Sequence, residues 1–252
     1  MEHQLWFTWV LNKLLGGVVA ALLGQLALVN PWFEFVRPAD PANPIPNYVA
    51  MEILVVLILV GAGLILRSGL SVENPGKFQH LMEVVVEFVQ STADEIIGHG
   101  GRRYVPMLGT LFLFIAICNL IGLIPSLATP TAMIQVTLGS AVAAFLYYNF
   151  HGIRQHGILG YLKHLCGPML AIAVLMFPIE VISNVGRLLS LSVRLYANML
   201  VGDILEKVFG GMVPILVPVI FMALHIFVSL LQAYIFMLLP AIYIGMAVSE
   251  EH

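Results

Sequence analysis

Two long apolar stretches near the end of the chain limit what it can fold into. Residues 168–202 and 208–248 run for 35 and 41 residues with few charged side chains. As helices, each would extend roughly 50–60 Å, whereas the hydrocarbon core of a bilayer is roughly 30 Å thick. Such helices must break, or tilt far beyond the usual angle of about 20°. We therefore expect two long antiparallel membrane helices, strongly oblique to the bilayer normal, that are joined near residues 203–212.

The composition also indicates a membrane protein. Of 252 residues, 60% are hydrophobic and 10% are charged, and the mean hydropathy is +0.97. One soluble core could not bury that much apolar surface. The net charge of −3 gives no indication of a nucleic-acid partner. Cys118 and Cys166 stand apart, and no metal-binding or nucleotide-binding motif is present, so we expect neither a metal nor a cofactor.

Three further stretches have the composition of membrane spans, namely 49–66, 106–127 and 132–150. Residues 77–98 keep apolar side chains on one face, which is typical of an amphipathic helix on the membrane surface. The polar residues 151–167 are expected to form a loop. The predicted fold is an all-α polytopic membrane protein with about five membrane helices and one surface amphipathic helix, the last two membrane helices being long and strongly tilted.

The N-terminal part has a different character. Residues 5–29 are apolar but are interrupted by polar residues and glycines, so we expect an interfacial helix with Trp6 and Trp9 at headgroup level. Residues 30–47 contain five prolines and should form a loop. We also expect no cleavable signal peptide, because the first apolar run lacks a basic region and a small-residue cleavage site. The expected division of the chain is 1–47, the interfacial helix and Pro-rich loop, and 48–252, the membrane domain.

Basic residues predict the orientation of the chain. Six of them lie in the loops expected on one side of the membrane, Arg67, Lys77, Arg102, Arg103, Arg154 and Lys163. Three lie on the other side, Lys13, Arg37 and Lys207. Because short cytoplasmic loops carry an excess of Lys and Arg, the first group is expected to be cytoplasmic. This places the N-terminus outside and the C-terminal sequence SEEH inside.

A polar stripe runs along the first of the two long apolar stretches. Its members recur at steps of three or four residues, which places them on one helix face: Glu180, Ser183, Arg187, Ser190, Arg194 and Asn198. On the second long stretch, His225, Ser229 and Gln232 also share one face. The serines could simply hydrogen-bond between helices, as small polar residues often do in membranes. Arg187 could extend to the cytoplasmic interface, which leaves its role open.

Arg194 requires more explanation, because an arginine in the middle of a membrane helix costs about 2.5–3.5 kcal/mol on insertion scales. Glu180 precedes it by roughly 21 Å along a helix and Asp203 follows it by roughly 13 Å, so neither acid is a simple ion-pair partner. We therefore expect the counter-charge on another protein. Acids and a histidine on either side could relay protons, while an arginine, which stays protonated, would act as a positive barrier between them.

Two segments resemble subunit a of the rotary F-type ATP synthase of bacteria, SLSVRLYANMLVGDIL (190–205) and HIFVSLLQAYIFMLLPAIYI (225–244). The pattern R-L-x-x-N-M-x-x-G-[DE] followed by H-x(6)-Q-A-[FY]-[IV]-F is highly specific for that family. The resemblance is strong over 180–252, fair over 44–150 and loose over 1–43. The chain departs from the family pattern at Met133, Gln135 and Leu188.

The resemblance implies a proton-translocating stator subunit that offers two aqueous half-channels to a rotating ring of c subunits. Arg194 matches the essential arginine that faces this ring. The other positions carried over are Asn198, Asp203, His225 and Gln232 at the outer half-channel, Glu180 at the cytoplasmic half-channel, and Asn119 in the third helix. Such a subunit is not catalytic by itself, and it works in the bacterial cytoplasmic membrane with the c ring, the b subunits of the peripheral stalk and lipid.

Two other classes of protein remain as alternatives. A self-contained secondary transporter could use Arg194 to bind an anionic substrate, although such proteins usually contain repeated halves, which this chain lacks. An intramembrane hydrolase would need a nucleophile with a base, and His225 with Ser229 has no third orienting group in the sequence pattern. The presence of a histidine in the stripe favours protons over Na⁺ as the coupling ion, because histidine titrates near neutral pH.

Overall fold

The computed structural model describes residues 5–29, 44–71, 75–98, 100–124, 127–166, 170–210 and 216–248, and these residues form helices and connecting turns with no β-strand. The elements in order are α1 (Trp6–Val29), α2 (Asn47–Ser68), α3 (Lys77–Ile97), η2 (Gly101–Arg103), α4 (Val105–Ile121), η3 (Pro130–Ala132), α5 (Ile134–Cys166), α6 (Leu170–Gly210) and α7 (Leu216–Val248). Most of the predicted Pro-rich loop, at 30–43, and the SEEH end lie outside the described residues.

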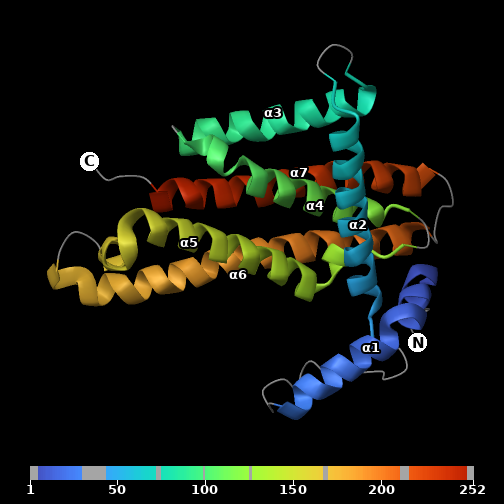
Figure 1. The fold of residues 1–252 in the computed structure, drawn as a ribbon, viewed down its shortest axis with the longest axis horizontal. Coiled ribbons are helices and arrows are strands. Elements are labelled where there is room, and N and C mark those ends of the chain that lie inside the picture. The colour runs from blue at the N-terminus through green and yellow to red at the C-terminus, as the bar shows by residue number, and fades with distance from the viewer. Residues whose placement is uncertain are drawn as a thin grey trace.

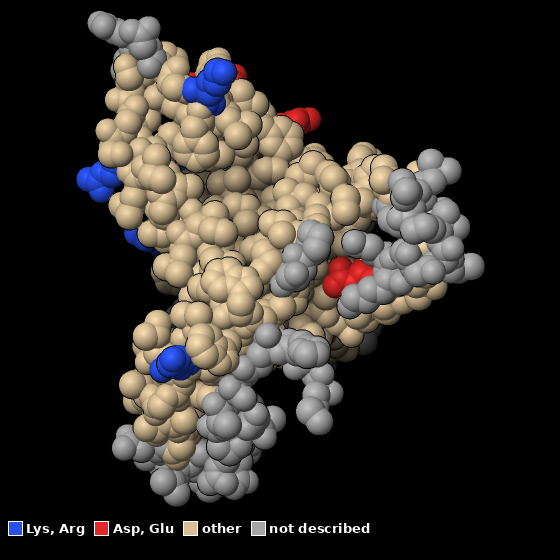
Figure 2. Space-filling view, turned by 90° about the vertical axis from the view of Figure 1, so that its right-hand side faces the viewer, with Lys and Arg blue, Asp and Glu red and all other residues tan. Residues whose placement is uncertain are grey.

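The helices have the lengths and compositions of a polytopic membrane protein. Four are long and apolar enough to cross a membrane, with spans at Trp6–Gly24, Asn47–Ser68, Met176–Leu205 and Val219–Val248, and Val105–Ile121 is a shorter apolar helix. Figure 2 shows one side of the molecule on which the few charged side chains stand singly among uncharged ones. The predicted all-α polytopic membrane fold is confirmed. The first of the four spans belongs to α1, whose interfacial placement stays a prediction.

The two long C-terminal helices lie side by side and both run across α2 (Figure 1). This arrangement agrees with the strong tilt expected from their length. The connection begins later than the start of the predicted range 203–212, because α6 continues as one 41-residue helix to Gly210 and α7 begins at Leu216. Polar residues such as Asp203 can remain helical near the end of a membrane helix. Their polar side chains indicate that the segment reaches water, and not that the helical backbone stops there. Asp203 therefore belongs to α6.

The segment 151–167, predicted as a polar loop, is also helical up to Cys166. The helix α5 continues from the membrane stretch through Arg154 and is interrupted at Gly157, where φ is 70° and ψ is 165°. A positive φ of this kind is readily adopted only by glycine, so Gly157 permits the change of direction. The residues after the break fold back, and the hydroxyl of Tyr161 donates a hydrogen bond of 2.8 Å to the amide oxygen of Asn149.

The amphipathic helix α3 packs its apolar side onto the bundle. Val89 and Ala93 are buried there against Leu108 of α4 and Ile244 of α7, in one hydrophobic cluster. A second cluster, centred on Leu195 and Phe236, holds α4, α5, α6 and α7 together. Figure 1 shows α3 running alongside α7 and across the end of α2, on the opposite side of the bundle from α1. The core thus fixes α6 and α7, which carry the polar stripe, against three other helices.

Candidate functional site

The polar stripe of α6 divides into an inward-facing part and an outward-facing part. Because α6 is one unbroken helix, its polar residues keep their helical spacing, and three apolar residues (Leu191, Leu195 and Met199) anchor the opposite face in the core. Glu180 and Arg187 are partly buried, whereas Arg194 and Asn198 are exposed. Arg194 therefore points away from the helices that α6 packs against.

Arg194 forms no ion pair with any of the residues that the structure describes. The described ion pairs lie elsewhere, between His80 and Glu83, Arg102 and Asp94, and Arg187 and Glu180. The exposed residues on α6 around it are uncharged, and they include the apolar Val193, which is 49% exposed, and the polar Ser190 and Asn198. A guanidinium without an ion-pair partner on an uncharged surface agrees with the expectation from sequence that its counter-charge is supplied by another protein.

A first polar cluster, here called the outer cluster, joins α6 and α7 on the C-terminal side of Arg194. The amide of Asn198 donates a hydrogen bond of 3.0 Å to the side-chain oxygen of Gln232, which is fully buried. The hydroxyl of Thr129, just before η3, donates a hydrogen bond of 3.1 Å to the carboxylate of Asp203. The hairpin of long helices thus brings three of the predicted site residues to the same end of α6.

Asn119 extends the outer cluster to α4. Its amide donates a hydrogen bond of 3.2 Å to the carbonyl oxygen of Ser229 on α7, and its oxygen accepts one of 2.6 Å from Thr131. All three side chains are fully buried. In a membrane interior such groups are stable only when they are hydrogen-bonded, so this chain of contacts fixes α4, η3 and α7 in register.

His225 faces α6 across a close contact with Gly202. A Cβ atom placed at Gly202 would lie 3.1 Å from both Cε1 and Nδ1 of the imidazole ring, so a side chain there would require the ring to shift by a few tenths of an ångström. The ring is 6% exposed, and neither of its nitrogens has a hydrogen-bond partner among the described residues. His225 also lines a cavity of about 260 Å³, together with Asn198 and Leu224. Asp203 and His225 therefore lie at the same end of the hairpin without a hydrogen bond between them.

A second polar cluster, here called the inner cluster, lies on the N-terminal side of Arg194. A guanidinium nitrogen of Arg187 lies 3.3 Å from the carboxylate of Glu180, and its charged group stands over the ring of Tyr243 at 5.3 Å from the ring centre. Asn184 donates to the carbonyl oxygen of Glu180 at 3.1 Å and accepts from the hydroxyl of Tyr148 at 2.8 Å. Arg187 is thus an ion-pair partner within the chain.

The sequence analysis missed several members of these clusters. Thr129 and Thr131 lie in a turn without charged residues, so the sequence drew no attention to them. Their place in the threonine-proline sequence ATPTA was the one feature that indicated polar contacts within the membrane domain. Tyr148 and Tyr243 stand in apolar stretches whose periodicity shows nothing unusual about them. A tyrosine hydroxyl buried in a membrane bundle needs a partner, and that requirement is the signal that could have singled out Tyr148.

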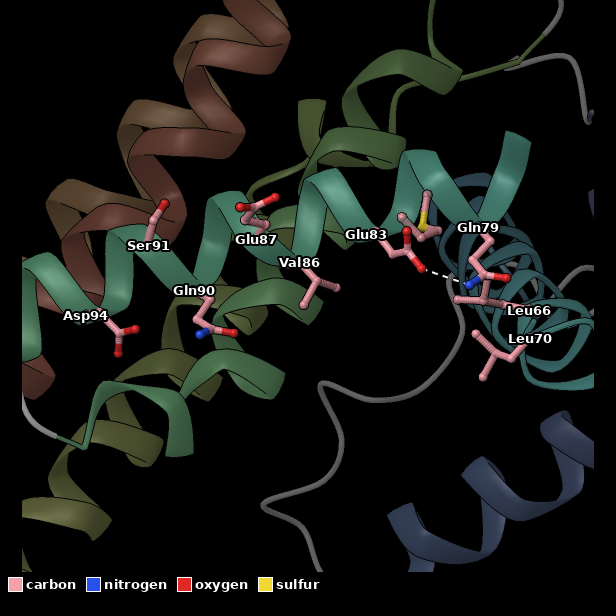
Figure 3. Close-up of a pocket in the computed structure, with 10 residues that line it drawn as sticks. Leu66, Leu70, Gln79, Glu83, Val86, Glu87, Gln90, Ser91 and Asp94 are labelled. Carbon is pink, nitrogen blue, oxygen red and sulfur yellow. Dashed lines mark hydrogen bonds between the residues drawn. The ribbon is translucent and has the colours of Figure 1, made fainter. Parts of the chain in front are cut away.

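A larger cavity, of about 650 Å³, is a groove far from this constellation, between the end of α2 and one side of α3 (Figure 3). Gln79 and Glu83 point toward one another in it, and the amide of Gln79 donates a hydrogen bond of 2.8 Å to Glu83. This hydrogen bond is the main reason why the pKa of the Glu83 carboxyl lies below its usual value, with a smaller effect of His80. The groove contains none of the residues that the sequence predicted as a site.

Comparison with known proteins agrees with the motif. Residues 49–245 match the model of the family described as ATP synthase A chain. A protein of Koribacter versatilis named ATP synthase subunit a is 46% identical over 252 residues, which covers 100% of both chains. One of Solibacter usitatus with the same name is 48% identical over 223 residues, covering 88% of this chain and 96% of the relative.

A third relative, ATP synthase subunit a 1 of Syntrophotalea carbinolica, is 43% identical over 199 residues and covers 79% of this chain and 84% of the relative. The region matched by the family model, 49–245, contains nearly all of α2, the whole of α3 to α6 and nearly all of α7, and therefore both polar clusters and Arg194 between them. With nearly half of all residues shared along the full length of a relative, the chain belongs to the family of ATP synthase subunit a.

Proposed function

We propose that this chain is the proton-translocating stator subunit of the membrane sector of an ATP synthase, with two aqueous half-channels that open to a rotating c ring. Residues 48–252 form the proton-channel domain in this proposal, and residues 1–47 supply an interfacial helix and a Pro-rich loop. The ring lies against the face of α6 that exposes Arg194 and Asn198. Catalysis of ATP formation belongs to other subunits of the complex, and none is assigned to this one.

The outer cluster is the entry half-channel in this proposal. Protons arriving from outside pass Asp203, His225 and Gln232 and reach the ring carboxylate close to Asn198. Three features support this path: the buried ring nitrogens of His225 without partners among the described residues, the adjoining cavity of about 260 Å³, and the fully buried amide of Gln232. A cavity of that size has room for several water molecules, each of which occupies about 30 Å³ in the liquid.

The inner cluster is the exit half-channel. After the ring has turned, the proton leaves its carboxylate and passes Glu180 towards the cytoplasm. The support is that Glu180 is only partly buried, on the other side of Arg194 from the outer cluster, and is held by Arg187 and Asn184. The membrane potential supplies about 2.3 kcal/mol for each charge moved through 100 mV.

Arg194 separates the two half-channels, and its position is the observation that carries the proposal. It is exposed on a helix face whose other exposed residues are uncharged, it has no ion-pair partner among the described residues, and polar clusters lie on either side of it. At an effective dielectric constant near 20, a carboxylate at ~4 Å from it would gain about 4 kcal/mol. This attraction favours the ionised ring carboxylate opposite Arg194, and the fixed positive charge prevents protons from crossing directly between the half-channels.

The proposed surroundings follow from the family and from the basic residues. The complex lies in the bacterial cytoplasmic membrane, with the N-terminus of this chain outside and its C-terminus inside, because six of the nine basic residues outside the polar stripe fall in loops on one side. The c ring and the b subunits of the peripheral stalk are the proposed protein partners, and the exposed apolar side chains of α2 and α5 face lipid.

The test is ATP-driven acidification of inverted membrane vesicles that contain Arg194→Ala, together with their passive proton permeability. The variant should assemble and insert but should neither pump protons nor support ATP synthesis, and passive permeability should rise. Arg194→Lys should also lose most pumping, because an ammonium group is more strongly hydrated and can lose its proton when buried. Val193→Ala, a neighbouring change on the exposed surface, is the matched control and should pump normally. Normal pumping by Arg194→Ala would refute the charge barrier.

A further inference from the structure

Two arginines from different elements lie near one histidine at the end of the bundle where α3 stops, and the ring of Tyr104, which follows Arg103, contacts the ring of this His151. Arg103 ends the short helix η2, and Arg154 lies on α5 three residues after His151. Both are exposed, and both act electrostatically on the imidazole ring of His151. Within the described part of the chain neither arginine forms an ion pair, whereas the adjacent Arg102 has Asp94 at 3.9 Å. The pair therefore presents two positive charges without a carboxylate.

Two aromatic rings contact the histidine of this site. The ring of His151 lies 5.1 Å from that of Tyr104 and 4.4 Å from that of Tyr147, measured between ring centres. Nδ1 of His151 is buried and has no hydrogen-bond partner in the described structure. Burial, and then the charges of Arg103 and Arg154, lower the pKa of the His151 ring below its usual value, which favours its neutral form.

An exposed apolar stripe leads along α5 to the arginines. Leu146 is 61% exposed, Phe150 is 59% exposed, and Arg154 follows at the next helical turn on the same face. Ile153, 38% exposed, lies beside them. One surface therefore carries apolar side chains along its length and positive charge at its end, which matches the two parts of a phospholipid.

We propose that Arg103 and Arg154 bind the phosphate of an anionic phospholipid beside the ring of His151, with one acyl chain lying along Leu146 and Phe150. The phosphodiester accepts hydrogen bonds from the guanidinium groups, whose planar geometry suits phosphate oxygens. Basic pockets between membrane helices on the cytoplasmic side are suited to anionic headgroups, and these arginines lie on the side expected to be cytoplasmic. The site is distinct from the proton path and does not depend on it.

The experiment uses the intact, purified complex that contains this chain, stripped of lipid in detergent and titrated with phosphatidylglycerol while bound lipid is counted by native mass spectrometry. Arg103→Gln combined with Arg154→Gln should weaken the tightest phosphatidylglycerol site roughly 30-fold, at about 1 kcal/mol for each arginine. Arg67→Gln combined with Lys77→Gln removes the same charge from the same expected side of the membrane and should change that affinity less than about twofold. Equal losses of phosphatidylglycerol affinity in both double variants would show that binding depends only on general surface charge, and would overturn the proposed site.

Three further arms identify the occupant. Arg103→Lys combined with Arg154→Lys keeps the charge and should retain most of the binding, which keeps the test valid if the glutamine variant assembles poorly. Inorganic phosphate should not displace phosphatidylglycerol, because it lacks the acyl chain, and displacement at equal concentration would overturn the lipid assignment. If phosphatidylglycerol binds only after Glu250→Gln and Glu251→Gln, the acidic end of the chain is the true occupant and the proposal is wrong.

Discussion

The amide of Asn198 donates a hydrogen bond of 3.0 Å to the side-chain oxygen of Gln232, and this bond links the two long helices one turn away from Arg194. Asn198 is exposed, whereas Gln232 is fully buried and its own amide nitrogen has no partner among the described residues. The contact therefore connects the surface that carries the arginine to the interior of the hairpin. It also keeps Asn198 in a defined orientation beside Arg194.

Removing this hydrogen bond should uncouple α6 from α7 at that level. We expect Asn198→Ala and Gln232→Ala each to destabilise the chain, with a coupling free energy of about 0.6 kcal/mol and at most about 1.7 kcal/mol, as for other hydrogen bonds between membrane helices. A double-mutant cycle measured by reversible unfolding in mixed micelles gives this value. Additive effects of the two changes would show that the contact contributes nothing.

The outer cluster should need titratable groups rather than particular residues. Asp203→Leu and His225→Leu are each expected to lower ATP-driven proton pumping at least about tenfold while the complex still assembles, because a relay loses a proton-carrying group. Asp203→His combined with His225→Gly or His225→Glu should restore part of the flux. The measurement is vesicle acidification normalised to the amount of assembled complex. If both leucine variants pumped protons at the parental rate, these two residues would have a role in packing rather than in proton transfer.

Gly202 should be intolerant of a side chain because of His225. The Cβ of Gly202→Ala would lie 3.1 Å from the imidazole ring, so we expect the ring to move and pumping to fall. Gly186→Ala is the matched control on the same helix, since its added methyl group would meet no neighbouring side chain of the described structure within 4 Å, and it should pump normally. His225→Ala makes room for the methyl group, and in that background Gly202→Ala should have no additional effect on pumping. A further loss there would show that Gly202 acts through another neighbour.

The orientation can be tested with single cysteines in sealed vesicles. With Cys118 and Cys166 replaced by serine, Asp40→Cys and Glu250→Cys should react with an impermeant maleimide from opposite sides of the membrane. The expectation follows from the excess of basic residues in the loops 67–103 and 151–167. Labelling of both positions from the same side would mean an even number of membrane crossings between them and would overturn the half-channel assignment.

The long-range plan of the fold could be predicted from sequence because it depends on lengths and periodicity. Helices of the length of α6 and α7 cannot stand upright in a bilayer, and the stripe from Glu180 to Asn198 survives because α6 is unbroken. The ends of elements were predicted less well. Arg154 and Asp203 were placed in or next to loops because they are polar, yet both are helical, since the backbone at a membrane surface can stay hydrogen-bonded while its side chains meet water.

The site was predictable where charge stands out against an apolar background. Arg194, Glu180 and His225 were proposed as candidate site residues for that reason. Their partners were not, because Thr129, Tyr148 and Tyr243 belong to residue types that are common in membrane helices and become informative only when tertiary contacts place them beside a charge or an amide. The pairing of Arg187 with Glu180 likewise depends on side-chain direction, seven residues apart on one helix, and spacing alone left it open.

The unbroken α6 also determines the direction in which the two polar clusters are separated. Glu180 and Asp203 are roughly 35 Å apart along this one rod, and because the rod lies across α2, much of that separation is sideways rather than through the bilayer. In the proposed function, a proton carried from one cluster to the other would therefore travel laterally on a moving carrier. In that case the direction in which a single helix is tilted would determine whether inward proton flow drives the carrier clockwise or anticlockwise.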